Sequence, residues 1–155
     1  MTAVSVSLVD VYVLRGAGLT LELLALRRGP GGRCPGSWEA VHGHIEAGES
    51  PPDAARRELL EETGLAPLRL YNLSRVELFY QHRRDEVALV PLFAAFVDPV
   101  GLVRLGPEHD RFEWLPPPAA RERFAWPRER RAVDDLLALV GTGDGGAVDD
   151  VLRVC

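Results

Sequence analysis

The chain has 155 residues, enough for a single domain with a substantial core. Hydrophobic residues make up 46% and charged residues 26%, as in an ordinary globular protein, and no apolar stretch approaches the length of a membrane span. The net charge of −5 argues against a surface built to coat nucleic acid, and two cysteines are too few for a disulfide framework.

The first part of the chain predicts strands around an irregular loop. Residues 3–14 are rich in β-branched and apolar types, which favours a buried strand. After a glycine-rich turn, residues 19–27 alternate apolar and polar types, as expected for a paired second strand. Residues 28–37 are rich in glycine and proline and predict a loop, and residues 38–42 predict a short strand that leads into Gly43.

A helix is predicted to begin after Ser50. Ser50 is a favourable N-cap, Pro51 suits the first helical position, and Asp53 suits the third. The helix is expected to run to about Thr63, because Gly64 is a typical C-terminal stop.

The second half predicts further strands and one more helix. Strands are expected at about 68–80, 86–97 and 111–115, the last ended by three prolines, and the apolar spacing of residues 127–140 predicts an amphipathic helix. Strands interleaved with two helices indicate an α/β (α+β) fold in which helices cover a mixed sheet.

No repeat or linker divides the chain. We expect one domain over residues 1–140, followed by a flexible C-terminal tail over residues 141–155, which is rich in glycine and aspartate.

The chemistry of the predicted helix lies in three glutamates. Glu58, Glu61 and Glu62 have i, i+3 and i+4 spacing, which places them within roughly one 100° stripe of the helix. Like charges this close repel one another, whereas a divalent cation with oxygen ligands, such as Mg²⁺ or Mn²⁺, would reverse the sign of that energy. The alternative for this triplet alone is a solvated acidic helix face.

Residues 43–65 as a whole resemble the Nudix box, Gly-x5-Glu-x7-Arg-Glu-U-x-Glu-Glu-x-Gly-U, in which U is a bulky apolar residue. The defined positions are all matched, by Gly43, Glu49, Arg57, Glu58, Leu59, Glu61, Glu62, Gly64 and Leu65. The resemblance implies an α/β/α sandwich with a mixed central sheet. It also implies metal-dependent hydrolysis of nucleoside diphosphates linked to another group.

The resemblance also implies roles for the matching residues. Glu58, Glu61 and Glu62 are expected to bind Mg²⁺ or Mn²⁺, helped by the carbonyl group of Gly43. Glu49 and Arg57 are expected to form the ion pair that fixes the loop to the helix. Members of the family differ in the general base, so Glu58 and Glu62 both remain candidates for this role.

Residues 108–115 resemble the Glu-His…Trp-Leu segment of Nudix enzymes similar to dihydroneopterin triphosphate pyrophosphatase, also called dATP pyrophosphohydrolase. By this resemblance Glu108 is a fourth metal-ligand candidate, against the alternative of an ordinary loop glutamate. Arg28, one of an adjacent arginine pair, is the candidate for contact with substrate phosphate. Further candidates for substrate contact are the aromatic residues and one turn histidine, namely Trp38, Phe79, Tyr80, Trp126 and His82.

The leading hypothesis is a cytoplasmic Nudix pyrophosphohydrolase that cleaves a nucleoside triphosphate or a related compound by water attack at phosphorus. The cytoplasm is expected because the N-terminal residues lack the pattern of a signal peptide. ADP-ribose and dinucleoside polyphosphates remain open as substrates, and a non-catalytic nucleotide sensor is the alternative from another class. The expected partner is a small nucleotide, with no nucleic-acid polymer and no membrane. Homodimers occur in the family, but no segment here identifies an interface.

Overall fold

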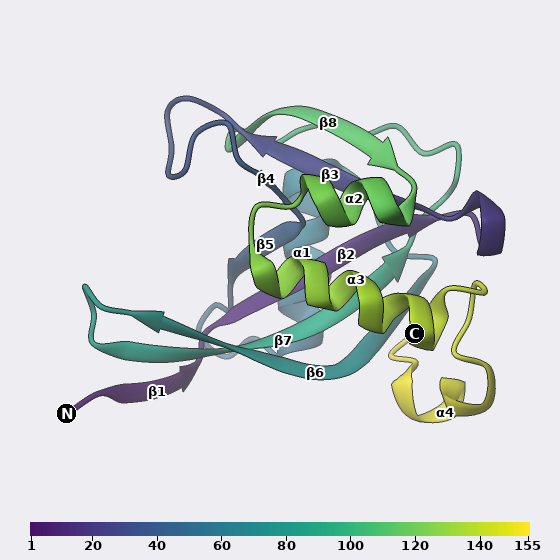
Figure 1. The fold of residues 1–155 in the computed structure, drawn as a ribbon. Helices are drawn as coiled ribbons and strands as arrows, with labels where there is room; N and C mark the ends of the chain where they lie inside the picture. Colours follow the sequence, from purple (N-terminus) through teal and green to yellow (C-terminus); the bar gives the residue numbers. More distant parts are fainter.

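The computed structural model describes all 155 residues and contains an eight-stranded mixed sheet with helices on both faces (Figure 1). The strands are β1 (Ala3–Val6), β2 (Leu8–Arg15), β3 (Glu22–Arg28), β4 (Trp38–Glu39), β5 (Val41–His44), β6 (Arg69–Gln81), β7 (Glu86–Phe96) and β8 (His109–Leu115). The helices are η1 (Gly18–Thr20), α1 (Pro51–Thr63), α2 (Pro117–Arg123), α3 (Pro127–Val140), η2 (Gly146–Val148) and α4 (Asp149–Leu152). The predicted α/β fold with a mixed central sheet is therefore confirmed.

The two faces of strand β2 build two separate cores. Because successive side chains of a strand point to opposite faces, Val9 and Val11 pack into the core beneath α1, whereas Tyr12 and Leu14 pack into the core beneath α2 and α3. Figure 1 shows this layering, with α2 and α3 in front of the sheet and α1 behind it. Strand β2 is thus buried on both sides and forms the middle layer of the sandwich.

An opening between β2 and β3 makes room for the segment that leads to α1. Strand β2 pairs in parallel with β7 on one side, while on the other side its beginning pairs with β5 and its end with β3. Strand β3 in turn pairs with β4 and β8. The chain therefore passes from β3 to β2 through the short strands β4 and β5, and Gly43 of β5 lies just before the acidic segment.

Local chemistry sets the ends of α1. The Ser50 hydroxyl accepts a hydrogen bond from the Asp53 backbone N–H at 3.3 Å, as an N-cap should. Gly64 ends the helix with a φ of +71°, in the left-handed region that glycine tolerates best. The predicted boundaries of this helix are confirmed.

The N-terminal strands differ from the sequence prediction in two places. The expected strand over residues 3–14 is broken at Ser7, because β1 and β2 pair with β7 in different registers: Val6 lies opposite Leu89 and Asp10 opposite Leu92. Pro91, which has no N–H to donate, lies between these two stretches of β7. The strand predicted over residues 19–27 begins later, because residues 18–20 form the turn η1.

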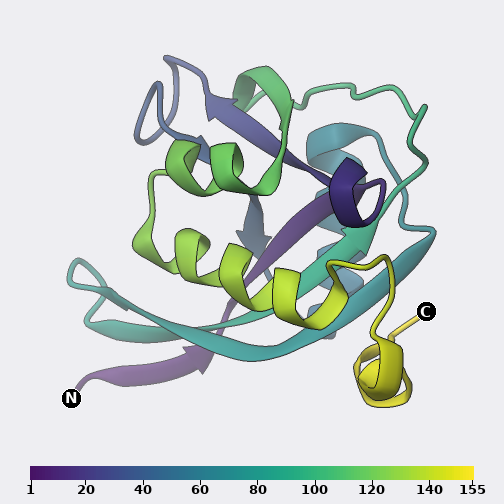
Figure 2. The ribbon, with the colours of Figure 1, turned by 45° about the vertical axis from the view of Figure 1, so that its right-hand side comes forward.

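The C-terminal third also differs from the prediction. The three prolines after β8 do not only end that strand but also begin α2, since proline is tolerated in the first turn of a helix. Residues 141–155, for which a flexible tail is predicted, lie beside β6, where Tyr71 donates a hydrogen bond to Asp149 at 2.7 Å and Leu152 is buried. Figure 2 shows this yellow segment lying beside the end of the sheet. The apolar and tyrosine side chains that hold it are far away in sequence, so composition alone does not reveal the contact.

None of the helices combines the length and the apolar character that a bilayer crossing requires.

Candidate active site

A cleft of about 750 Å³ lies between the loop over residues 29–37, the turn of the β6–β7 hairpin and the start of α3. Its walls come from segments that are distant in sequence, including β4, β5, α1 and the loop before β8. Three of the predicted metal-binding groups line it, namely Gly43, Glu58 and Glu108, together with the predicted phosphate contact Arg28.

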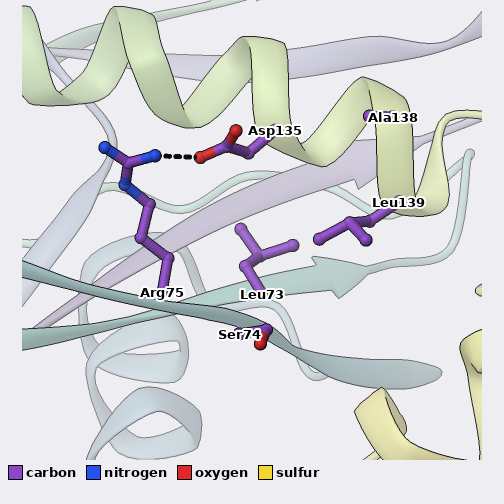
Figure 3. A pocket seen from close by; sticks show the side chains of 6 residues that line it. All are labelled: Leu73, Ser74, Arg75, Asp135, Ala138 and Leu139. Atoms are coloured by element: carbon purple, nitrogen blue, oxygen red, sulfur yellow. Dashed lines mark hydrogen bonds and ion pairs between the residues drawn. The ribbon is translucent and has the colours of Figure 1, made fainter.

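A second hollow, of about 340 Å³, lies between β6 and α3 (Figure 3). Leucine and alanine side chains form much of its wall, and its two charged groups, Arg75 and Asp135, are paired with each other. Because no charged group there is left for a ligand, the larger cleft is the candidate active site.

Arg57 connects the acidic residues of the motif. Its guanidinium makes a two-pronged pair with Glu49, with Nε–Oε1 and Nη2–Oε2 distances of 2.8 and 2.9 Å, and also donates to the carbonyl of His44. The third nitrogen, Nη1, lies 2.9 Å from Glu58 and 3.3 Å from Glu61. The pair with Arg57 lowers the pKa of Glu49 to about 2, so this carboxylate stays charged and holds the loop to the helix.

Glu58 and Glu62 occupy unfavourable places for negative charge. Burial raises the pKa of Glu58, and the negative charges of Glu61 and Glu108 raise it further against the opposing effect of Arg57. Glu62 is only 5% exposed and its Oε2 has no hydrogen-bond partner. Burial, then the charges of Glu39, Glu58 and Glu108, raise the pKa of Glu62 well above its ordinary value.

These environments fit a bound cation. A buried carboxylate oxygen without a partner and two carboxyl groups with raised pKa values would all be stabilised by a positive ion among them. The carboxyl group of Glu58 also packs on the α-carbon of Gly43. No three acidic, histidine or cysteine side chains converge on one point here. Arg57 Nη1 instead supplies the positive charge between Glu58 and Glu61.

The loop before β8 brings Glu108 to the acidic helix. The backbone N–H groups of Arg104 and Gly106 donate to the carbonyls of Thr63 and Glu62 at 2.8 and 3.2 Å, so the loop is hydrogen-bonded to the last turn of α1. On its other side, the Glu108 carbonyl accepts a hydrogen bond from the Gly29 N–H at 3.0 Å. Glu108 thus lies in the cleft with Glu58, at a position fixed by backbone contacts on both sides.

Glu39 is a site residue that the sequence does not reveal. It is buried, and its Oε1 lies 2.9 Å from both Arg28 Nη1 and His109 Nε2. Burial alone would raise the pKa of Glu39, but the hydrogen bonds from His109 and Arg28 outweigh it and lower the pKa. Glu39 therefore neutralises Arg28, the predicted phosphate contact, and ties the loop of Glu108 to strand β4.

Asp10 forms a second buried network that the sequence does not reveal. It is 1% exposed, its Oδ1 lies 2.6 Å from His42 Nδ1, and its Oδ2 lies 2.8 Å from Arg128 Nε. Beside it, Glu129 accepts hydrogen bonds from the N–H groups of Ala40 and Trp126 at 2.7 and 3.3 Å. The only sequence signal is an aspartate in the apolar run of β2, which gives no indication of its partners.

Three predicted substrate contacts do not line the cleft. Trp38 packs against the core beneath α2 and α3, with the guanidinium of Arg123 4.7 Å from its ring. Tyr80 donates to Asp85 at 3.1 Å, and His82 is exposed in the hairpin turn. Tyr80 does not line the cleft because successive side chains of a strand point to opposite faces, and its neighbour Phe79 faces the cleft.

Two other aromatic candidates do line the cleft. Phe79 comes from β6, and Trp126 precedes α3, with the guanidinium of Arg128 5.7 Å from its ring. The cleft therefore has an acidic end at Gly43, Glu58 and Glu108 and an aromatic wall that is suited to a flat ring.

An α/β/α sandwich with this acidic loop–helix segment beside its main cleft has the organisation of a Nudix domain. The model of the NUDIX domain matches residues 1–136, and the chain belongs to this family. The chain is 41% identical over 138 residues to a Myxococcus xanthus protein named octanoyltransferase, a match that covers 84% of this chain and 36% of that one. It is 33% identical over 98 residues to the bis(5'-nucleosyl)-tetraphosphatase of Rattus norvegicus, covering 62% of this chain and 65% of the rat protein. The chain thus spans about a third of the first relative and just under two thirds of the second.

Solved structures support the same fold. An Ap4A hydrolase of C. elegans superposes with a TM-score of 0.70 at 20% identity, covering 84% of this chain and 94% of that one. The dihydroneopterin triphosphate pyrophosphohydrolase of E. coli superposes with a TM-score of 0.66 at 25% identity, with the same coverage of the two chains. The similarity to the latter enzyme, which residues 108–115 suggest, is therefore confirmed.

Proposed function

We propose that this protein is a Mg²⁺- or Mn²⁺-dependent hydrolase that cuts a phosphoric anhydride bond in a nucleotide. The observation that carries the proposal is the position of Glu58 in the cleft, packed on Gly43 and linked through Arg57 to Glu49 and Glu61. The names of the rat, C. elegans and E. coli proteins, a tetraphosphatase, a hydrolase and a pyrophosphohydrolase, support this reaction class.

Glu58, Glu61, Glu62 and Glu108, with the carbonyl of Gly43, would hold the cation. A bound Mg²⁺ or Mn²⁺ supplies charge neutralisation at the phosphate oxygens and lowers the pKa of a water molecule. The arginine of the motif keeps the loop and the helix together, so that the carboxylates approach the substrate from one side. Glu58 and Glu62 are the candidates for the group that accepts a proton from the attacking water once the cation is bound.

The aromatic wall would hold the base of the nucleotide. Phe79 and Trp126 are large apolar surfaces in a cleft whose other side is acidic and polar. Stacking of a flat ring on such surfaces tolerates different bases. We therefore propose a nucleoside triphosphate, or another compound that contains a nucleoside diphosphate, as the substrate class.

A dinucleoside polyphosphate is the second candidate. It is favoured by the 33% identity to the rat bis(5'-nucleosyl)-tetraphosphatase, a relative of which this chain spans 65%. The match to the octanoyltransferase covers 36% of that protein, so it does not support octanoyl transfer by this chain.

The test is incubation with a panel of nucleoside triphosphates, a dinucleoside tetraphosphate and ADP-ribose, with and without Mg²⁺, and separation of the products. We expect metal-dependent turnover of at least one compound and its loss in Glu61→Gln and Glu62→Gln, with melting temperatures that show the variants to be folded. Binding of a nucleotide without turnover of any compound would contradict the proposal and favour a sensor. Unchanged turnover in both variants would show that the assigned acids are wrong.

A further inference from the structure

Four arginines line the cleft, and they differ in whether an acid neutralises them. Arg28 pairs with Glu39 at 2.9 Å and Arg128 pairs with Asp10 at 2.8 Å, and both carboxylates are buried. Arg33 and Arg84 also line the cleft, but neither takes part in any ion pair of the structure. The cleft therefore has two cations whose charge is not compensated.

In the loop over residues 29–37 and at its start, Arg33 rather than Arg28 is the arginine whose charge is not paired. The Arg28 Nε donates to the backbone carbonyl of Arg33, and the backbone of Arg28 exchanges hydrogen bonds with Ser37 and Gly36 at 2.9 and 2.8 Å. Arg28 thus serves to fold the loop over residues 29–37, with its own charge taken by Glu39. The side chain of Arg33 is exposed and makes no comparable contact within the loop.

The second cation comes from the opposite wall. Arg84 is in the turn between β6 and β7, where its backbone N–H donates to Gln81 at 3.1 Å. The neighbouring acid Asp85 is already engaged by Thr2 and Tyr80. Figures 1 and 2 show the hairpin turn and the loop over residues 29–37 projecting on the same side of the molecule. Arg33 and Arg84 line the same cleft as Gly43 and His44 of β5, so they share the space next to the acidic end of the cleft.

We propose that Arg33 and Arg84 form an anion subsite for the phosphate groups that lie beyond the bond cut at the acidic end. Two free guanidinium groups on opposite walls suit a flexible chain of phosphates, because each can approach a different phosphate oxygen. A substrate with two phosphates places both of them at the acidic end and leaves this subsite without a ligand. The subsite therefore selects nucleotides with a long phosphate chain, of three phosphates or more. This inference rests on the proposed function only for the position of the reacting bond.

The first test is calorimetric titration of the metal-free protein with inorganic tripolyphosphate, in the presence of a chelator. Arg33→Gln and Arg84→Gln should each weaken binding roughly 5-fold, since each removes one charged hydrogen-bond donor. The matched control is Arg83→Gln, because Arg83 is the exposed neighbour of Arg84 that does not line the cleft, and it should change the affinity by less than about twofold. Equal losses in the Arg83 and Arg84 variants, or no tripolyphosphate binding by the parent, would overturn the subsite.

The second test compares kinetic constants for a dinucleoside tetraphosphate and for ADP-ribose. In Arg84→Gln the KM for the tetraphosphate should rise roughly 5-fold with kcat nearly unchanged, because the lost contact is the same in the ground state and the transition state. The KM for ADP-ribose should stay the same. An equal rise for both compounds would show a general effect of charge and refute the subsite. If the parent hydrolyses no compound of the nucleotide panel but binds tripolyphosphate in an Arg84-dependent manner, the proposed function fails and the subsite stands.

Discussion

The carboxyl group of Glu58 lies against the α-carbon of Gly43 so closely that a β-carbon at residue 43 would be 2.0 Å from it. No side chain at residue 43 is compatible with this contact. The close approach explains why a glycine is needed there even though its strand, β5, pairs regularly with β2.

Gly43→Ala should therefore displace the Glu58 carboxyl group. We expect a loss of activity on the order of 100-fold, because a shift of about 1 Å in a catalytic group has this effect, and a loss of stability of about 1–3 kcal/mol from overpacking. Gly31→Ala is the matched control, since Gly31 lines the same cleft and an added β-carbon there meets no atom within 4 Å. Turnover and chemical denaturation of both variants check the prediction, and equal behaviour of the two would contradict it.

Glu62→Gln should stabilise the metal-free protein at neutral pH while it removes activity. The pKa of Glu62 is raised above its ordinary value of 4.5, so the folded state keeps a proton that the unfolded state releases. Stability contributed by the protonated group is fully present below about pH 4.5 and is lost as pH rises toward the folded pKa. The melting temperature of the variant should exceed that of the parent at pH 8 and match it at pH 4. Addition of Mg²⁺ should reverse the order at pH 8, and identical pH profiles would refute the assignment.

Asp10→Asn should destabilise the fold strongly. It leaves the Arg128 guanidinium, 12% exposed, without its buried partner, which costs about 3–5 kcal/mol in comparable pairs. Burial raises the pKa of Asp10, but hydrogen bonding and attraction to His42 and attraction to Arg128 lower it overall, to about 2. This group therefore contributes stability above its ordinary value of 3.8 that is lost as pH falls toward 2.

Urea denaturation between pH 7 and pH 2 checks this prediction. The parent should lose stability between about pH 4 and pH 2 more steeply than Asp10→Asn. Asp134→Asn provides the control, because its pair with Arg121 is about half exposed and should contribute less than about 1 kcal/mol. Equal losses in the two variants at pH 7 would show that the buried pair has no special role.

The helices illustrate what the sequence can predict. The ends of α1 depend on Ser50 and Gly64, which act on backbone groups within one turn, and α3 follows the predicted range of residues 127–140. Such signals are local, so they are readable without a structure. The strand over residues 3–14 is different, because its break at Ser7 depends on the register with β7, more than 80 residues away.

The residues of the candidate site also divide into those that local sequence signals predict and those that depend on contacts distant in sequence. The acids of residues 43–65 are held by contacts within one loop and one helix, such as the pair of Glu49 and Arg57. Asp10 and Arg128, in contrast, are 118 residues apart, and no spacing rule connects them. That Trp126 rather than Trp38 lines the cleft likewise depends on tertiary packing, because Trp38 packs against the core beneath α2 and α3.

His109 is predicted to position Glu108. Its side chain is 0% exposed, its Nε2 lies 2.9 Å from Glu39, and its Nδ1 has no partner. Because the lowered pKa of Glu39 keeps that carboxylate charged, His109 Nε2 acts as the donor. His109→Leu should lower kcat/KM roughly 10-fold, whereas His109→Gln, whose amide group can still donate to Glu39, should recover much of the loss.

Two further measurements separate this role from a general loss of stability. In a Glu108→Gln background, His109→Leu should cost much less than in the parent, because the two residues act as one unit. Exchange of the Gly29 amide, which donates to the Glu108 carbonyl at 3.0 Å, should become faster in His109→Leu but not in Tyr71→Phe, which removes a hydrogen bond far from the cleft. Additive kinetic losses together with an unchanged Gly29 exchange rate would show that His109 only packs in the core.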